Sequence, residues 1–221
     1  MRGVYAIVDL EAVDHVGIDP IGFGEAILQR GVCALQLRAK NCDGARFLAI
    51  ARGLDRAARE ARTPFYVNDR VDIALLAGVG GVHVGQTDLA PREVRSLAER
   101  CSAHVAVGLS THNEEQLDRA LDEPIDYIAI GPVFSTISKA RPDPVLGLER
   151  AKSLAARVKA RRPTLPVVAI GGIGVARAAE LSGVVDCVAV ISALVPKASE
   201  GAGGVCARTQ ALLEAFAGPR P

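Results

Sequence analysis

Two cations and an amide occupy alternate positions in the segment QLRAK. If this segment is a strand, Gln36, Arg38 and Lys40 point to one side of the sheet and the apolar residues between them to the other. Polar groups that face a protein interior are costly unless a ligand or a counter-charge meets them. Because two neighbouring cations suit a phosphate or pyrophosphate, the segment predicts an anion site. The alternative is a salt-bridged cluster that fills the interior.

Two carboxylates end the next two apolar segments. Asp69 follows FYVN, and Asp88 follows GVHVGQT. Beside a bound diphosphate the pair would suit Mg²⁺, which takes one or two carboxylates together with phosphate oxygens and waters. The alternative is that each aspartate caps the following helix, a common role for this residue. Pro91, a favoured residue at the start of a helix, lies close after Asp88 and fits that alternative.

A loop rich in hydroxyl groups follows a later apolar segment. The stretch GPVFSTISK carries Thr136 and Ser138 and ends in Lys139. The loop spanning 133–147 is long enough to act as a lid over a bound ligand. Small hydroxyls followed by a lysine can wrap an anion, although a lone lysine on a loop is usually solvated.

Small residues end the last two apolar segments. The turn AIGGIG contains Gly171 and Gly172, and VISAL contains Ile191 and Ser192. In a barrel, the loops after the seventh and eighth strands commonly bind phosphate through backbone N–H groups. GGIG alone is weak evidence, because any tight turn favours glycine. The two turns together predict a second anion site.

Eight short apolar segments must position these groups. They are YAIVD, ALQLRA, FYVND, GVHVGQ, HVAVGLS, YIAIGP, PVVAIGG and CVAVIS. Continuous apolar strands are buried on both faces, which is typical of parallel sheets. Helix-like stretches lie between them, at 47–61, 91–100 and 113–121, with an apolar stripe or a capping residue.

An α/β chain of this kind is either a closed (β/α)8 TIM barrel or an open doubly wound sheet. Nearly every apolar segment ends in polar residues or glycine. In a barrel all eight ends converge on one mouth, whereas an open sheet uses only those near its switch point. We therefore predict a single TIM barrel domain over residues 1–221, with no linker that divides the chain.

Composition excludes several classes of protein. The formal net charge of +1 and the absence of Trp argue against nucleic acid as a partner. Five cysteines form no CxxC pair, so neither a disulfide framework nor a structural zinc site is expected. No run of about 18 apolar residues predicts a membrane span, and the N-terminal segment does not read as a signal peptide. We predict a cytoplasmic enzyme that acts on small molecules. Assembly into a homo-oligomer is compatible with this prediction.

Taken in order, the motifs resemble those of the thiamine-phosphate synthase family, also called thiamine-phosphate pyrophosphorylase. They are QLRAK, NDRVDIAL, GVHVGQTDL, VGLSTHNEE, DYIAIGPVFSTISK, GLE, VVAIGGI and VISAL. The resemblance implies a (β/α)8 barrel that joins hydroxymethylpyrimidine diphosphate to a thiazole phosphate and releases pyrophosphate. It further implies a dissociative reaction. The C–O bond to pyrophosphate breaks, an aminopyrimidine-stabilised cation forms, and the thiazole nitrogen attacks it.

The resemblance also assigns roles to individual residues. The residues that would hold the pyrimidine diphosphate are Gln36, Arg38, Lys40, Asn68 and Lys139. Those that would bind the thiazole phosphate are Thr136, Ser138, Gly171, Gly172, Ile191 and Ser192. Asp69 and Asp88 would bind Mg²⁺, and Ser110 would lie near the reacting groups. The catalytic set implied is Arg38, Lys40, Ser110 and Lys139.

The loop after the sixth segment departs from the family pattern. Ser135 stands where the family often has Pro, and Ser138 where it often has Thr, so a hydroxyl is kept but some rigidity is lost. The nearest rival is a thiazole tautomerase with His112 as proton carrier, a class that tends to lack the QxRxK cations and the aspartate pair. A non-catalytic phosphate-binding barrel is a rival of a different class. A sugar-phosphate isomerase would need a base that the sequence does not reveal.

Overall fold

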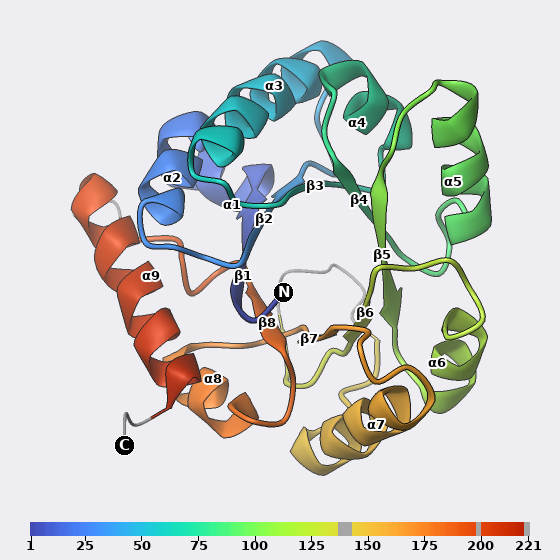
Figure 1. The fold of residues 1–221 in the computed structure, drawn as a ribbon. Coiled ribbons are helices and arrows are strands. Elements are labelled where there is room, and N and C mark those ends of the chain that lie inside the picture. Colours follow the sequence, from blue (N-terminus) through green and yellow to red (C-terminus); the bar gives the residue numbers. More distant parts are fainter. Residues whose placement is uncertain (137–142, 198–199, 219–221) are drawn as a thin grey trace.

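A closed ring of parallel strands forms the centre of the molecule (Figure 1). The computed structural model describes residues 1–136, 143–197 and 200–218. Within them, the strands are β1 Gly3–Asp9, β2 Ala34–Arg38, β3 Phe65–Asn68, β4 Gly81–Val84, β5 Ala106–Thr111, β6 Tyr127–Ile130, β7 Val167–Ala169 and β8 Cys187–Val190. Each strand pairs with the next along the chain, and β8 pairs with β1. The predicted (β/α)8 barrel is confirmed.

Helices surround the strand ring and cover its outer face (Figure 1). Within the described residues they are α1 Leu10–His15, α2 Pro20–Leu28, α3 Gly44–Glu60, α4 Val71–Ala77, α5 Pro91–Arg100, α6 Glu114–Ala120, α7 Leu148–Arg161, α8 Val175–Leu181 and α9 Gly201–Ala217. Between ring and helices lies the main core, to which both layers contribute buried aliphatic side chains. No described helix is both long and apolar enough to cross a membrane.

Capping residues decide where several helices begin. The helix predicted at 47–61 starts earlier, at Gly44, because the Asp43 side chain accepts the Arg46 backbone N–H at 2.9 Å. The predicted helix at 91–100 has those bounds in the structure. Asn113 caps α6 by accepting the Gln116 N–H at 2.9 Å, as its residue type indicates.

Aromatic side chains fill the inside of the ring. Tyr5, Tyr66 and Tyr127 are buried in a second cluster of apolar residues that point toward the barrel axis. Glycines make room for them: a Cβ added at Gly81 would lie 2.3 Å from the Tyr66 ring, and one at Gly108 would lie 2.0 Å from the Tyr127 ring. The interior is therefore a packed floor rather than an open pore.

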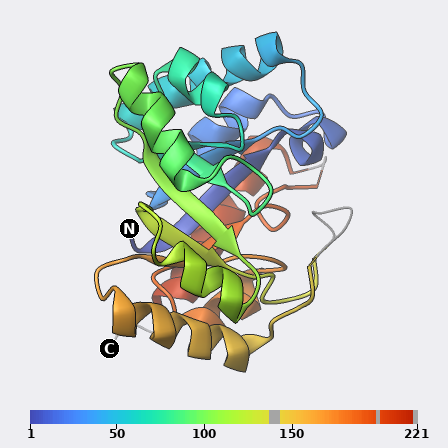
Figure 2. The same cartoon turned by 90° about the vertical axis from the view of Figure 1, so that its right-hand side faces the viewer.

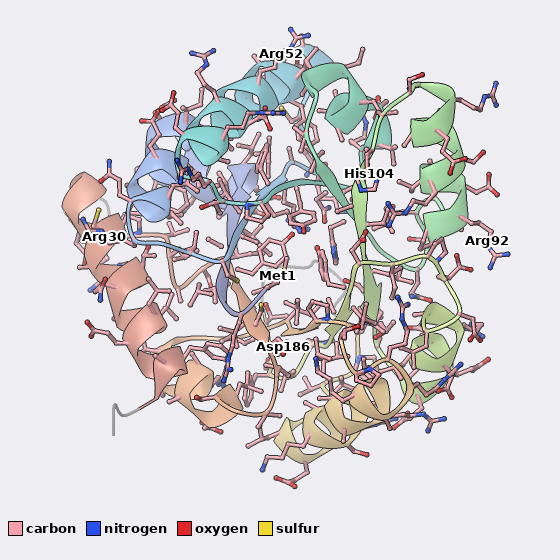
Figure 3. The ribbon with its side chains drawn as sticks, in the orientation of Figure 1. Met1, Arg30, Arg52, Arg92, His104 and Asp186 are labelled. Carbon is pink, nitrogen blue, oxygen red and sulfur yellow. The ribbon has the colours of Figure 1, made fainter. Side chains whose placement is uncertain are left out.

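The carboxyl ends of the strands carry predicted site residues. Figure 2 shows the barrel from the side, with the start of the chain at the left. In Figure 3, side chains fill the ring, and the labelled Arg30, Arg52 and Arg92 lie on the outer rim. Of the predicted site residues, Arg38 ends β2, beside Asp9 at the end of β1.

Candidate active site

A cavity of about 130 Å³ leads from the carboxyl ends of the strands down toward the tyrosines of the floor. A cavity of roughly this size accepts a ring as large as benzene. Nine predicted binding residues line it, namely Gln36, Arg38, Asn68, Ser110, Thr136, Gly171, Gly172, Ile191 and Ser192. Barrel closure thus gathers residues from β2 to the loop after β8 around one space.

The cationic side of the mouth is built around Arg38. Its guanidinium forms an ion pair with Asp9, and the side chains of both are largely buried. Asp9 also accepts the Ala12 N–H at 3.1 Å, so it caps α1 while it orients Arg38. The strand predicted through Lys40 is wrong at its end, because β2 stops at Arg38. Lys40 lies in the turn that follows, where it pairs with Asp69; neither it nor the two predicted metal ligands are among the residues that line the cavity.

The two predicted metal ligands lie close together. Asp69 forms an ion pair with Lys40. Burial raises the pKa of Asp69, Lys40 lowers it, and the nearby Asp88 carboxylate raises it again; the net direction is upward. The side chain of Asp88 accepts the Gly85 N–H at 2.8 Å.

The helix-capping alternative for the two aspartates is wrong. Neither α4 nor α5 has a side-chain cap, and their N-cap residues are Arg70 and Ala90. Asp69 instead has a φ of 61°, a left-handed conformation in which aspartate is found more often than most residues, and its carboxylate pairs with Lys40.

The donors at this corner fit Mg²⁺ bound together with a phosphate. Burial and, to a smaller extent, the neighbouring Asp88 carboxylate raise the pKa of Asp69, so its charged form would gain from a nearby divalent cation. Among the described residues, no three His, Cys, Asp or Glu side chains cluster in a way that would hold a metal alone. Mg²⁺ typically binds to one or two carboxylates and takes its remaining ligands from substrate phosphates and water.

The opposite side of the cavity is formed by tightly packed turns. Gly171 and Gly172 have φ values of 93° and 66°. A Cβ at Gly171 would lie 2.4 Å from Pro132, and one at Gly172 would lie 2.2 Å from the Ser135 carbonyl oxygen. The two loops therefore approach each other closely, and both glycines line the cavity without a side chain of their own.

Arg177 contacts both the loop after β6 and the loop after β7. Its guanidinium donates to the Gly172 carbonyl oxygen at 2.6 Å and stacks 4.7 Å above the centre of the Phe134 ring. The loop after β6 and the loop after β7 are therefore joined by one side chain of α8.

A line of hydrogen bonds crosses the cavity floor. Gln36 Nε2 donates to Tyr5 Oη at 2.9 Å, and the Tyr5 and Tyr127 hydroxyls lie 2.9 Å apart. His83 Nδ1 lies 2.7 Å from Tyr127 Oη, and His83 Nε2 lies 2.8 Å from Ser110 Oγ. Sequence reasoning left the side of the barrel on which His83 lies undecided; the structure places it inside.

Sequence comparisons identify the family of this chain. A family model described as thiamine monophosphate synthase matches residues 4–194. A thiamine-phosphate synthase of Koribacter versatilis is 42% identical over 175 residues, which are 77% of each chain. One from Laribacter hongkongensis is 39% identical over 201 residues, which are 90% of each chain.

The chain belongs to the thiamine monophosphate synthase family.

Solved structures agree with this family. The thiamine phosphate pyrophosphorylase from Pyrococcus furiosus superposes with a TM-score of 0.81 and 30% identity, covering 97% of this chain and 95% of that chain. A tryptophan synthase from Mycobacterium tuberculosis, at 17% identity and a TM-score of 0.70, shares the fold alone. Membership makes the chain an enzyme, a transferase with thiamine-phosphate synthase activity.

The tautomerase alternative gains no support from these relatives. His112 does line the cavity, but its Nδ1 is hydrogen-bonded to the Gly131 carbonyl oxygen and its Nε2 lies 3.4 Å from the Asp143 carboxylate. These contacts hold the ring between β5 and the loop after β6, which is the role of a histidine that orients a loop.

Two predicted residues of the family set, Ser138 and Lys139, lie outside the described residues. Others were missed from sequence: Asp9 as the partner of Arg38, and Tyr5, His83 and Tyr127 as members of the floor. Gly108 beside Tyr127 was the one signal available, because a glycine within a strand marks a place where something bulky comes close.

Proposed function

We propose that this enzyme joins 4-amino-5-hydroxymethyl-2-methylpyrimidine diphosphate to thiazole phosphate or its carboxylate. Pyrophosphate is released and thiamine phosphate is formed. The observation that carries the proposal is that Arg38, Asn68 and the turn at Gly171 and Gly172 line one cavity of about 130 Å³. The ion pair of Lys40 with Asp69 lies in the residues that follow Arg38 and Asn68 along the chain. Such an arrangement suits a reaction whose two substrates each carry phosphate.

The diphosphate would lie at the side of the mouth formed by β2 and β3. Arg38 and Lys40 would neutralise its oxygens, with Asn68 nearby as a polar contact and Lys139 from the loop after β6 as a third cation. Asp69 and Asp88 would hold Mg²⁺. When bound, that ion would stabilise the negative charge of the departing pyrophosphate.

No proton-transfer dyad is required for this step. The C–O bond breaks with its electron pair going to pyrophosphate, and the thiazole nitrogen donates its lone pair to the resulting pyrimidine cation. The protein then contributes charge at the leaving group and alignment of the two rings. The aminopyrimidine would lie in the cavity above the floor, between Gln36 and Ser110.

The thiazole phosphate would lie on the opposite side. Gly171, Gly172, Ile191 and Ser192 would bind its phosphate, largely through backbone N–H groups. Thr136 and Ser138 would contact the carboxylate. Because Arg177 joins the turns that flank this position, the phosphate would meet a site formed in advance.

We further propose that residues 1–221 act as one domain in the cytoplasm, with small molecules rather than nucleic acid or membrane as partners. Assembly into a homo-oligomer is compatible with this proposal.

Release of pyrophosphate from the pyrimidine diphosphate tests the proposal. Release should require both the thiazole phosphate and Mg²⁺, and thiamine phosphate should accumulate in equal amount. Asp69→Ala and Lys139→Ala should each lose most of this rate while circular dichroism shows an intact barrel. Near-normal turnover in both variants would reject the assigned roles, and absence of thiamine phosphate with wild type would reject the function.

A further inference from the structure

Five polar side chains from five strands form one unbroken chain across the floor of the barrel. They are Tyr5 of β1, Gln36 of β2, His83 of β4, Ser110 of β5 and Tyr127 of β6. All five are buried, with exposed fractions between 1% for the two tyrosines and 9% for His83. Four contacts between 2.7 and 2.9 Å connect them in the order Gln36, Tyr5, Tyr127, His83, Ser110.

The number of protons in this chain fixes its direction. Gln36 Nε2–H donates to Tyr5 Oη, so the single Tyr5 proton is free to go to Tyr127. Tyr127 then gives its own proton to His83 Nδ1. An Nδ1 that accepts carries no proton, so a neutral His83 is protonated at Nε2, which donates to Ser110 Oγ.

The consequence lies at the cavity. Because Ser110 accepts from His83, its own O–H is left to donate to a ligand. At the other end, the Gln36 carbonyl oxygen has no hydrogen-bond partner among the described residues, and Gln36 lines the cavity. If the Gln36 amide turned over, every bond in the chain would reverse and Ser110 would donate to His83 instead of to the ligand.

We propose that His83 is a positioning residue, fixed as its Nε2–H tautomer by Gln36, Tyr5 and Tyr127, and that this chain keeps Ser110 as a hydrogen-bond donor to the pyrimidine substrate. The role of Ser110 toward that substrate rests on the proposed function; the tautomer of His83 does not.

Two further observations support the assumptions of one proton on each phenol and of a fixed His83 ring. Burial raises the pKa of both Tyr5 and Tyr127 well above the ordinary value, so both phenols keep their protons at neutral pH. The His83 ring lies nearly parallel to the Tyr127 ring, at 16° and with centroids 5.5 Å apart, which holds Nδ1 toward the phenol.

The tautomer can be read directly from imidazole ¹⁵N shifts. The chain has four histidines, and the His83→Gln variant assigns the signal. We expect an Nε2–H imidazole in the wild type and in Tyr66→Phe, which removes a hydroxyl from the same aromatic cluster but outside the chain. Tyr127→Phe should let the proton exchange between the two ring nitrogens.

Gln36→Glu gives the sharpest prediction. An ionised carboxylate only accepts, so at high pH Tyr5 must donate to it and each later bond must reverse. His83 should then be protonated at Nδ1, although the substitution lies three side chains away. An Nδ1–H imidazole in the wild type, or a tautomer unchanged by both Gln36→Glu and Tyr127→Phe, would overturn the proposal.

Activity supplies an independent test of the link to Ser110. Tyr127→Phe should lower kcat by about fivefold to tenfold, the rate equivalent of one neutral hydrogen bond. In a Ser110→Ala background the same change should cost less than about twofold, because the two residues act in one chain. Tyr66→Phe should leave kcat unchanged. Equal losses in both backgrounds would show a merely structural role for Tyr127.

The two kinds of failure are distinguishable. If wild type makes no thiamine phosphate but His83 keeps the Nε2–H tautomer, the proposed function fails and the hydrogen-bond chain stands. If the wild type makes thiamine phosphate but the His83 tautomer is the same in Gln36→Glu and Tyr127→Phe as in the wild type, the positioning role fails.

Discussion

Each cation described at the mouth meets a carboxylate of the protein itself. Arg38 contacts Asp9, and Lys40 contacts Asp69. The salt-bridged interpretation of QLRAK is therefore confirmed for these two pairs, and the diphosphate site stays a prediction. An incoming anion would compete with Asp9 for a guanidinium that is already oriented, which limits the rearrangement that binding requires.

The pairing of Asp9 with Arg38 should matter for stability. Asp9→Asn keeps a capping oxygen for α1 but leaves Arg38 largely buried without its partner, so we expect a loss of about 3 kcal/mol in the free energy of unfolding. Asp14→Asn is the matched control, because its pair with Arg46 is exposed and should contribute little. Urea unfolding of the two variants measures the difference, and equal midpoints would contradict the argument.

Residue types showed the charged part of the site but not the floor. Arg38, Asp69 and Asp88 could be predicted because charges at the ends of apolar strands need a partner. Tyr5 and Tyr127 could not, because a strand buried on both faces does not reveal which side chains point toward the barrel axis. The direction of His83 was hidden for the same reason.

Loops rather than helices set the shape of the thiazole-phosphate side. The turn at Gly171 and Gly172 packs against the segment from Pro132 to Ser135, and Arg177 holds the two together. Strand positions were predicted well from runs of apolar residues. The close approach of these loops was not, because glycine in a turn indicates a positive φ without indicating what lies beside it.

Alanine at Gly172 should separate crowding from backbone strain. Gly172 and Gly17 have nearly equal φ values of 66° and 68°, but a Cβ at Gly17 meets nothing within 4 Å, whereas one at Gly172 would lie 2.2 Å from the Ser135 oxygen. We expect Gly172→Ala to destabilise the protein by about 1–3 kcal/mol more than Gly17→Ala. Its KM for the thiazole phosphate should also rise, while that of Gly17→Ala stays normal. Thermal unfolding and steady-state kinetics measure both effects; equal behaviour of the two variants would refute the crowding argument.

Ion pairs join α6 to α7, which are neighbours in Figure 1. Arg150 contacts Glu114 at 2.5 Å, and Arg157 contacts Asp118 at the same distance. The Arg150 guanidinium, with the backbone N–H of the helix start, lowers the pKa of Glu114 from 4.5 to about 2.

This shift has a definite sign for stability. A carboxyl whose pKa is lower in the folded state stabilises that state above pH 4.5 and loses its contribution as the pH falls toward about 2. Arg150→Met should return the pKa of Glu114 toward 4.5, as ¹³C NMR titration of the carboxyl can show. Arg208→Met, which removes the partner of Glu200, should leave Glu114 unaffected. The stability effect should be small because the pair is exposed.

Closure of the barrel brings residues from distant parts of the sequence to one cavity. Gln36 and Ser192 are far apart in the sequence, yet both line the same cavity. The number of strands and their polar ends were sufficient to predict closure, because only a barrel brings eight carboxyl ends to one mouth. Side-chain pairing within the mouth needed the structure, since contacts such as Asp9 with Arg38 depend on barrel register.

Calorimetric titration with pyrophosphate, with and without Mg²⁺, tests the central claim most directly: the carboxylate pair holds a divalent cation that helps bind the diphosphate. Mg²⁺ should raise pyrophosphate affinity by at least about tenfold in the wild type. The same gain is expected in Asp118→Asn, a control whose carboxylate pairs with Arg157. Asp69→Asn and Asp88→Asn should lose that gain. An equal effect of Mg²⁺ in all four proteins would contradict the account.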